Sequence, residues 1–490
     1  MTIEDDLDAI DADQISPSSV PMFPPIRRAR TPKRVLAYYT KGNIYTEIGK
    51  KFTVSDWGDL YDLMFRENLC LFVESLSDYD DFKFLYDCII DPRASVACSK
   101  KGIAIGVILS YKNNTRWIVQ FSTWNLEPGI VSILQLRKLM NYIGMGDYHT
   151  PARLGRELMY HVWRMYQLPR HTQPNGFCCE FLKKNQSGGR VDTPGLGKHY
   201  DEVIEIDMSS AYLSNFMVHP TGTSVPWHNT RYAMHREFPV WFGECLIDIM
   251  EDLPLGPFPV RKYDELDRFK TIDYPTKKGT YRTYIWSSTA EVCEKYNCRV
   301  DPIAGYGWYE LTADNALWSN LAYLMKKNAE YDFVEDMWKQ CIVAAIGSHG
   351  MNQVFYELVP EEEADLSKDR HFTSDREAFD WVIVEKRNLS QPRMSHWFGS
   401  TLARTSNDVF SNAYKYAREN RLVATNYDSI IFEIRDLQSD TGHYVSRTDA
   451  RSVPAGTWRW EILHDVDIIA PRSLKSREKT ILPGVDRKDR

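Results

Sequence analysis

Two short apolar stretches, each interrupted by an aspartate, constrain the fold of this chain more than any other feature. The first, EVIEIDMSSAYLSNF (202–216), alternates apolar and polar residues up to Asp207, which is typical of a strand followed by a turn. The second, LVATNYDSIIFE (422–433), is typical of two strands with a tight break at Asp428. Either aspartate could simply be a turn former. As a pair on neighbouring strands, they predict a site for divalent cations.

Strand and helix patterns alternate along the rest of the chain, which predicts a multidomain α/β (α+β) fold. A length of 490 residues allows two to four domains. β-branched and aromatic runs predict strands at 34–40, 69–76, 101–111, 115–124 and 238–249, the third and fourth as a pair. Apolar residues at helical spacing predict helices at 56–68, 80–90, 129–144, 150–166, 315–347 and 397–420.

Composition narrows the function without identifying it. The net charge of −7 does not favour a nucleic-acid binder, although the field inside a cleft is what decides binding. Aromatic residues make up 13% of the chain, which suits packed cores and equally suits stacking on bases. The nine cysteines lack paired C-x-x-C spacing, so we expect reduced thiols and no zinc site. No secretory segment and no run of 18 apolar residues is present, which predicts a cytoplasmic protein that does not span a membrane.

A lysine between the two aspartates completes a pattern that suits phosphoryl transfer. Lys339 lies on a predicted helix that ends at Gly347. Two carboxylates on neighbouring strands can hold two Mg²⁺ ions about 4 Å apart, and a lysine on a facing helix can neutralise a triphosphate. The alternative for Lys339 is a solvated position on an amphipathic helix.

Three motifs in this order resemble those of the family B DNA polymerases, closest to the protein-primed branch. The family's D-x-x-S-L-Y-P-S is matched by DMSSAYLS (207–214), its K-x-x-x-N-S-x-Y-G by KQCIVAAIG (339–347), and its D-T-D-S by NYDS (426–429). SGGR (187–190) resembles the Gly-Gly segment that precedes the polymerase domain in that family. The helix at 397–420 resembles the one before the third motif. The match spans about 185 to 435.

The resemblance implies roles for individual residues. Asp207 and Asp428 would bind Mg²⁺ or Mn²⁺, beside Asn426. Tyr212 would lie under the incoming sugar, unless it is a core aromatic. Lys339 would hold the triphosphate, with Lys327 as a second candidate. The backbone amides of Ser209, Ser210 and Ala211 would cradle phosphate oxygens.

Several departures from the family pattern bear on activity. Asn426 stands where the family has an aspartate, and it carries no charge. In the finger motif, Asn-Ser-x-Tyr has become Val-Ala-Ala-Ile (343–346). The first strand of the N-terminal domain, within 35–43, lacks the acids of the family's exonuclease. We therefore predict a degenerate domain that does not proofread.

The resemblance also implies an order of domains. The predicted ranges are a disordered arm (1–33), a degenerate RNase H-like exonuclease domain (34–170), a first palm part with an insertion (171–320), fingers (321–350), a second palm part (351–435) and a reduced thumb with a basic tail (436–490). Such right-hand polymerases act in DNA replication in phages and mobile elements. The expected partners are primer and template DNA, dNTPs and, for protein priming, a terminal or accessory protein.

Three functions remain open at this point. The leading one is a DNA polymerase-like nucleotidyltransferase that extends a 3′-OH or a protein hydroxyl. The second is a weak or inactive relative that serves as a nucleic-acid-binding or assembly subunit, which Asn426 and the acidic net charge favour. The third is template-independent or specialised synthesis, which the altered finger motif favours.

Overall fold

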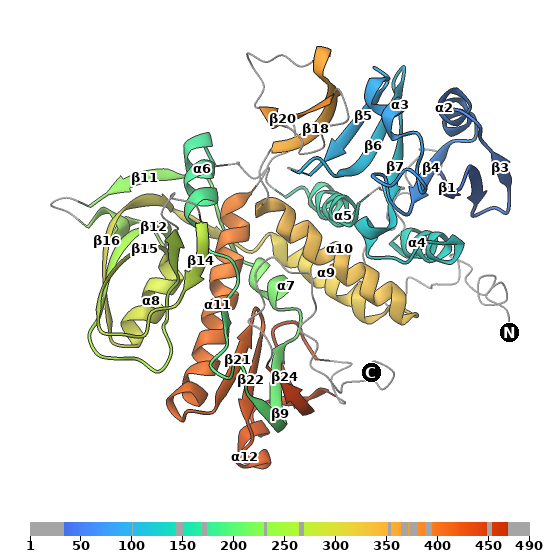
Figure 1. Cartoon of the computed structure of the whole chain (residues 1–490). Coiled ribbons are helices and arrows are strands. Elements are labelled where there is room, and N and C mark those ends of the chain that lie inside the picture. The colour runs from blue at the N-terminus through green and yellow to red at the C-terminus, as the bar shows by residue number, and fades with distance from the viewer. Residues whose placement is uncertain are drawn as a thin grey trace. The chain divides into compact units, whose positions relative to one another are not determined.

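The computed structural model describes residues 34–99, 101–143, 150–168, 174–229, 233–263, 269–350, 354–363, 371–372, 381–387, 394–447 and 453–468. The predicted disordered arm and basic tail lie outside these residues. The chain divides into two compact units (Figure 1). The first comprises 1–161, 324–345 and 352–392, and the second comprises 162–323, 346–351 and 393–490. No described helix is long and apolar enough to cross a membrane.

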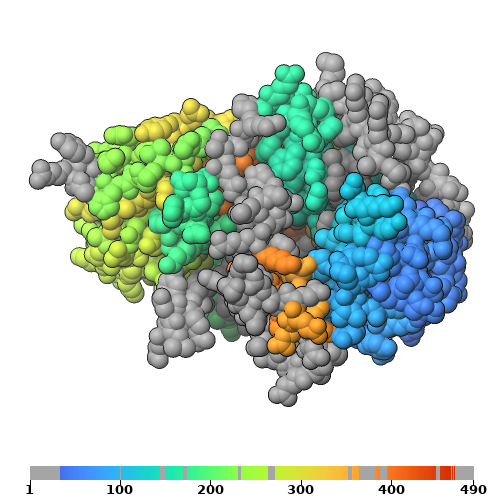
Figure 2. Space-filling view, turned by 90° about the horizontal axis from the view of Figure 1, so that it is seen from above, coloured from blue at the N-terminus to red at the C-terminus, as the bar shows by residue number. Residues whose placement is uncertain are grey.

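A ten-stranded mixed sheet forms the centre of the first unit. Its order is β19-β20-β18-β5-β6-β7-β4-β1-β2-β3. β1, β4 and β7 run parallel to one another, and β2 and β3 follow β1 as an antiparallel edge. The strands are β1 (Val35–Thr40), β2 (Asn43–Thr46), β3 (Lys51–Thr53), β4 (Leu69–Val73), β5 (Ala94–Cys98), β6 (Ala104–Tyr111), β7 (Asn114–Gln120), β18 (Val354–Pro360), β19 (His371–Phe372) and β20 (Trp381–Arg387). In Figure 2 the blue and light-blue atoms, which are those of the strands β1–β7 and of the helices between them, form one continuous body.

Helices accompany this sheet and pack closely against one another. A Cβ atom added to Gly155 would lie 2.4 Å from the carbonyl oxygen of Cys341, so glycine permits α5 and α10 to approach. Met337, Cys341 and Ala345 are buried on α10 at the spacing that the sequence predicts. The helices that begin in this part of the chain are α2 (Trp57–Arg66), α3 (Leu85–Ile90), η2 (Phe121–Trp124), α4 (Ile130–Ile143), α5 (Pro151–Met165), α10 (Asp332–Gly350) and η4 (Glu361–Glu363).

The second unit contains a four-stranded antiparallel sheet in the order β11-β16-β12-β15. One core of the unit joins Trp227 and Trp241 to Cys245, Ile247 and Cys293, all of them buried. The elements of this part are α6 (Gly176–Asn185), β10 (His219–Thr221), β11 (Val225–His228), η3 (Met234–Glu237), β12 (Val240–Ile249), β13 (Val260–Tyr263), β14 (Phe269–Asp273), β15 (Gly279–Trp286), α8 (Ser287–Lys295), β16 (Cys298–Trp308), β17 (Glu310–Thr312) and α9 (Asn315–Lys327), of which the last turn of α9 belongs to the first unit.

A six-stranded sheet in the order β23-β24-β9-β22-β21-β8 completes the second unit. The long helix α11 (Ser395–Arg418) buries Val409, Phe410 and Ala413 against one face of this sheet. The remaining elements are β8 (Val191–Asp192), β9 (His199–Met208), α7 (Ala211–Phe216), β21 (Leu422–Asn426), β22 (Ser429–Glu433), α12 (Leu437–Thr441), β23 (Val445–Ser446) and β24 (Trp458–Asp467).

Several local predictions are confirmed, and the structure adds arrangements that the sequence pattern leaves open. The β6–β7 pair and the helix leading into β21 form as predicted, and all nine cysteines are free and buried. The helical stretch at 315–347 is two helices, α9 and α10. β18 and β20 lie in the ten-stranded sheet, which β18 joins through β5. β24 pairs with β9. Both pairings join strands that are distant in sequence, where periodicity carries no information. The assignments of 351–435 to the palm and of 436–490 to the thumb stay predictions.

Candidate active site

The two faces of the six-stranded sheet differ in chemistry. Ile204 and Ile206 of β9 point to the face that α11 covers, where they join an apolar core. Residues 205 and 207 alternate with them and therefore lie on the opposite face. The facing positions on β22 and β24 add further polar residues there, namely Ser429, Arg459 and Glu461. Val203, Ile431 and Leu463 form an apolar cluster on this same side of the sheet, so the side is polar only around Asp207. This polar part, called the polar face below, is the candidate active site.

Strand register brings the two predicted aspartates together. Asp207 pairs directly with Ser429, the residue that follows Asp428. The backbone amide of Met208 donates a hydrogen bond to the carbonyl oxygen of Asp428 at 2.9 Å. The aspartates therefore lie at the same end of adjacent strands, as the sequence predicts.

The turn that carries Asp428 is held in an uncommon conformation. Tyr427 has a φ of 53°, in the left-handed region that non-glycine residues rarely adopt. Its amide donates to the carbonyl oxygen of Arg190 at 2.8 Å. A Cβ atom on Gly189 would lie 2.4 Å from the Tyr427 ring, so this position has room only for glycine. The SGGR segment is therefore the support of the Asp428 turn.

The side chain of Arg190 holds the SGGR segment in place. It is 1% exposed and forms an ion pair with Asp192 at 2.5 Å. It also donates to the carbonyl oxygen of Gly256 at 2.7 Å and lies 4.2 Å from the centre of the Tyr274 ring. Asp192 in turn accepts a hydrogen bond from the Thr425 hydroxyl at 2.8 Å, one residue before Asn426. Through Asp192, these contacts connect the buried guanidinium to Thr425, on the side where the chain enters the turn.

Tyr212 lies beside the same turn, on the short helix α7. Its hydroxyl is 3.4 Å from the position that a Cβ atom on Gly189 would take. Burial raises the pKa of Tyr212, and the nearby carboxylate of Asp428 raises it further. Tyr212 is therefore a neutral, half-buried ring next to Asp428, which is compatible with the predicted place under a sugar.

Arg459 of β24 forms an ion pair with the Asp207 carboxylate. The two residues are direct cross-strand partners, and Arg459 Nη2 donates to Asp207 Oδ2 at 2.5 Å. The side chains are 16% and 22% exposed, so the pair is largely withdrawn from water. A charge-assisted contact of this length in a partly desolvated place is strong.

Acidic residues surround this ion pair. Glu205 lies two positions before Asp207 and directly opposite Glu461 of β24. Burial, with Glu461 and Asp207 nearby, raises the pKa of Glu205 to about 7. Arg447 forms an ion pair with Glu461, which offsets part of the negative charge. The polar face thus combines several acids with two arginines.

The residues at the turn are suitable ligands for a hard divalent cation. Carboxylate oxygens of Asp207 and Asp428 and the amide oxygen of Asn426 are the oxygen ligands that Mg²⁺ and Mn²⁺ prefer. Asn426 Oδ1 is buried without a hydrogen-bond partner among the described residues. Within that same part of the chain, no three His, Cys, Asp or Glu side chains group closely enough to hold a metal ion. Two acidic side chains and one neutral amide are therefore the candidate ligands here, and their role stays a prediction.

Other predicted residues are placed as follows. Lys339 is exposed on α10, and Lys327 ends α9; both belong to the first unit, and their roles stay predictions. The amide of Ser209 donates to the carbonyl oxygen of Thr457 at 2.9 Å, so it is already used within the protein. Ser210 has a φ of 53° and, with Ala211, remains a candidate for contact with phosphate.

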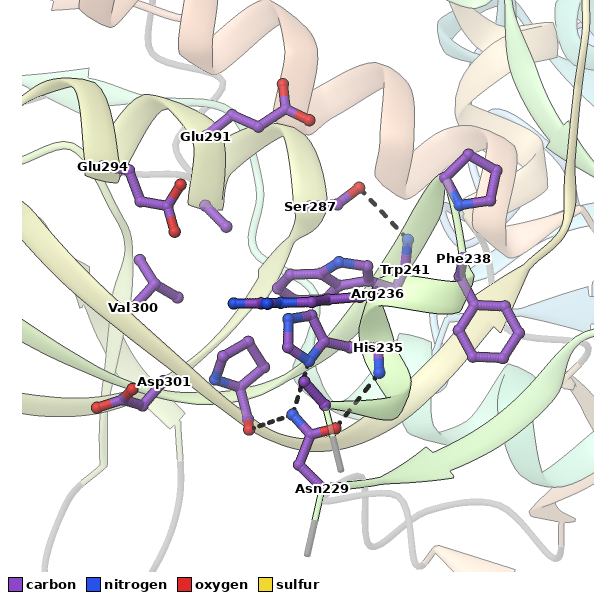
Figure 3. A pocket seen from close by; sticks show the side chains of 14 residues that line it. Asn229, His235, Arg236, Phe238, Trp241, Ser287, Glu291, Glu294, Val300 and Asp301 are labelled. Atoms are coloured by element: carbon purple, nitrogen blue, oxygen red, sulfur yellow. Dashed lines mark hydrogen bonds between the residues drawn. The ribbon is translucent and has the colours of Figure 1, made fainter. Parts of the chain in front are cut away.

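A cavity of about 590 Å³ lies elsewhere in the second unit, between η3, β12, α8 and β16 (Figure 3). Asn229 fixes one wall by hydrogen bonds to His235 Nδ1 at 2.7 Å and to the carbonyl oxygen of Pro302 at 2.8 Å. Glu291, Glu294 and Asp301 lie around it. None of the predicted site residues lines this cavity.

Sequence reasoning did not select Glu205 or Arg459 for the candidate active site. It also did not predict that the Arg190 side chain holds the turn. The alternation in WRWEIL (458–463) is a signal for a strand with Arg459 and Glu461 on one face. Only the pairing of β24 with β9 reveals that this face is the one with Asp207.

Comparison with known proteins shows which solved structures have a similar fold. No family model and no curated protein matches the chain. Solved structures of Phi29 DNA polymerase match it over most of its length. An orthorhombic crystal form has a TM-score of 0.63 at 10% identity, and a complex with primer-template DNA has 0.66 at 10%; both cover 89% of this chain and 86% of that chain. A ternary complex with primer-template DNA and incoming nucleotides has 0.64 at 11%, covering 87% and 84%. The chain therefore has a fold similar to that of a DNA polymerase.

Proposed function

We propose that the protein is a DNA polymerase-like nucleotidyltransferase of the family B type, with the candidate active site as its catalytic centre. One observation carries the proposal: in a fold similar to that of a DNA polymerase, strand register puts Asp207 at the end of β9 that adjoins the turn with Asp428. These are the two aspartates that the motif resemblance selects independently of the structure.

The proposed reaction is the addition of a deoxynucleotide to a 3′-OH or to a protein hydroxyl. The hydroxyl oxygen forms a bond to the α-phosphorus, the bond from that phosphorus to the bridging oxygen breaks, and pyrophosphate leaves. Asp207 and Asp428 would hold Mg²⁺ or Mn²⁺, which when bound neutralises charge on the phosphates. Tyr212 would contact the sugar, and Lys339 would bind the triphosphate. DNA and dNTPs are the expected partners, together with a terminal or accessory protein if priming is by protein.

The first unit is proposed to contain a degenerate, RNase H-like exonuclease domain. Its mixed sheet is compatible with this, and β1, Val-Leu-Ala-Tyr-Tyr-Thr, has no acidic side chain. Single-stranded DNA incubated with Mg²⁺ should remain intact, and robust 3′ digestion would refute this part of the proposal.

Primer extension tests the main proposal. Wild-type protein with primer-template, dNTPs and Mg²⁺ or Mn²⁺ should incorporate nucleotides, and Asp207→Ala or Asp428→Ala should abolish incorporation. Arg93→Met, which removes a half-exposed cation of the first unit, is a control that should keep activity. Absence of incorporation by wild type would refute the enzyme, and incorporation without template would favour specialised synthesis.

A second candidate is a weak or inactive relative that binds nucleic acid or serves in assembly. The ion pair between Arg459 and Asp207 favours it, because an arginine occupies an acidic group that the reaction needs. DNA binding by the wild type without any incorporation would support this candidate.

A further inference from the structure

We propose that Arg459 takes the place of one of the two cations expected at the candidate active site, so that this site binds a single divalent ion. The inference rests on the proposed function, and it concerns how the chain balances charge at Asp207.

Arg459 is built into the sheet beside Asp207. β24 pairs with β9 from Trp458–Met208 to Asp467–His199, so the backbone fixes the guanidinium opposite the carboxylate. The 2.5 Å contact uses Asp207 Oδ2. No hydrogen bond to Asp207 Oδ1 is found among the described residues, and this oxygen remains for an ion. Because Arg459 is 16% exposed, moving it away from Asp207 would leave a poorly solvated charge, which is strongly unfavourable.

Charge at the turn is reduced from the other side as well. Asn426 is neutral, and its Oδ1 is buried without a hydrogen-bond partner in the described part of the chain. An aspartate there would add a third negative charge. Asp207, Asp428 and Arg459 together carry a net charge of −1, the paired Glu461 and Arg447 add none, and Glu205 adds at most one negative charge. One divalent ion suits this charge, whereas a second would repel both the first ion and Arg459.

Asn426 and Arg459 both reduce the negative charge of the site. A guanidinium supplies fixed positive charge and directional donors, but it cannot be lost to solvent as a metal ion can. A phosphate oxygen that would contact a second ion would then meet the Arg459 side chain. The site would keep electrostatic stabilisation while needing only one ion, held between Asp207 and Asp428.

Counting bound Mn²⁺ tests this directly, with Mn²⁺ alone as the probe. The electron paramagnetic resonance signal of free Mn²⁺ is measured during titration of the full chain without nucleotide. Asp207→Asn/Asp428→Asn sets the background from other acidic residues. We expect one ion above background for wild type. Arg459→Met should tighten this ion about tenfold, because a nearby like charge is removed even under water-like screening. Asn426→Asp/Arg459→Met should bind two ions.

A matched control removes a different arginine of the same face. Arg447→Met deletes the cation paired with Glu461 and should leave both the number of ions and their affinity within about twofold of wild type. Thermal unfolding of each variant confirms that it is folded. Two ions in wild type, an unchanged affinity in Arg459→Met, or an equal effect of Arg447→Met would overturn the inference alone. No ion above background in any variant would refute the proposed function itself.

Discussion

Replacing Arg190 by methionine should loosen the turn that carries Asp428. The side chain is buried, and the substitution removes its ion pair with Asp192 and its hydrogen bond to the carbonyl oxygen of Gly256. Breaking one partner out of a buried pair costs about 3–5 kcal/mol, because the other charge stays behind. Asp192 is 15% exposed and keeps its bond from Thr425, so we expect the lower end, about 3 kcal/mol.

Hydrogen exchange measured by mass spectrometry reports this change where it occurs. The Tyr427 amide is bonded to the carbonyl oxygen of Arg190, so peptides covering 422–433 sense the loss. A local destabilisation of about 3 kcal/mol corresponds to exchange roughly 10²-fold faster in that segment. A local measurement is preferable to a single unfolding free energy, since a chain with two units is not expected to unfold in one step.

Two further variants make the Arg190 prediction refutable. Arg190→Met/Asp192→Asn leaves no buried charge and should recover part of the protection. Arg93→Met breaks a pair with the same two-residue spacing, to Asp91, but at a side chain that is 50% exposed and in the first unit, so it should leave 422–433 unchanged. Unaltered exchange in Arg190→Met, or a double variant as loose as the single one, would show that Arg190 does not support the turn.

Three other substitutions test separate parts of the structure. The hydrogen bonds from Arg93 and Trp57 lower the pKa of Asp91 to about 2. The ionised Asp91 therefore stabilises the fold by about 2 kcal/mol above its unfolded pKa of 3.8, and this contribution declines as the pH falls toward 2. In urea unfolding, the difference between wild type and Asp91→Asn should shrink by roughly half from pH 6 to pH 3, and a constant difference would contradict the pairing. Gly189→Ala should clash with the Tyr427 ring, cost about 1–3 kcal/mol and reduce primer extension, whereas Gly176→Ala, where nothing lies within 4 Å, should do neither. Ile206→Ala, at a fully buried position of β9, should destabilise the core around this strand by about 2–5 kcal/mol, seen as faster hydrogen exchange in peptides covering 199–208, and a smaller loss would mean that the core behind the site is loosely packed.

The sequence is informative wherever a feature is local. Alternation in EVIEID predicts β9 and the face of Asp207, and helical spacing predicts the buried side of α10. The β6–β7 hairpin needs only a short connection, and it is also predicted. The resemblance of the motifs selects Asp207 and Asp428 as neighbours, and the structure has Asp207 near the end of β9 and Asp428 in the turn before β22.

Long-range pairing is what local patterns could not supply. Arg459 reaches Asp207 across 252 residues of chain, and nothing in the residues around either position encodes that register. β18 similarly joins β5 by an antiparallel pairing far along the chain. The anchoring by Arg190 depends on contacts with Gly256 and Tyr274, which lie on a separate segment. These arrangements follow from the packing of the whole unit. The sequence therefore predicts the two aspartates of the candidate active site but not its arginines.

The central place of β9 in its sheet has a consequence for synthesis of the chain. Both neighbours, β22 and β24, come far later in the sequence, and Arg459 is made 252 residues after Asp207. At about 5–20 residues per second, a ribosome needs roughly 13–50 s to add them, and both edges of the nascent strand lack partners meanwhile. Unpaired edges invite association between copies, and like charges oppose it. The strand HYDEVIEIDM carries four acids, Asp207 among them, so we expect its negative charge to oppose association of unfinished chains.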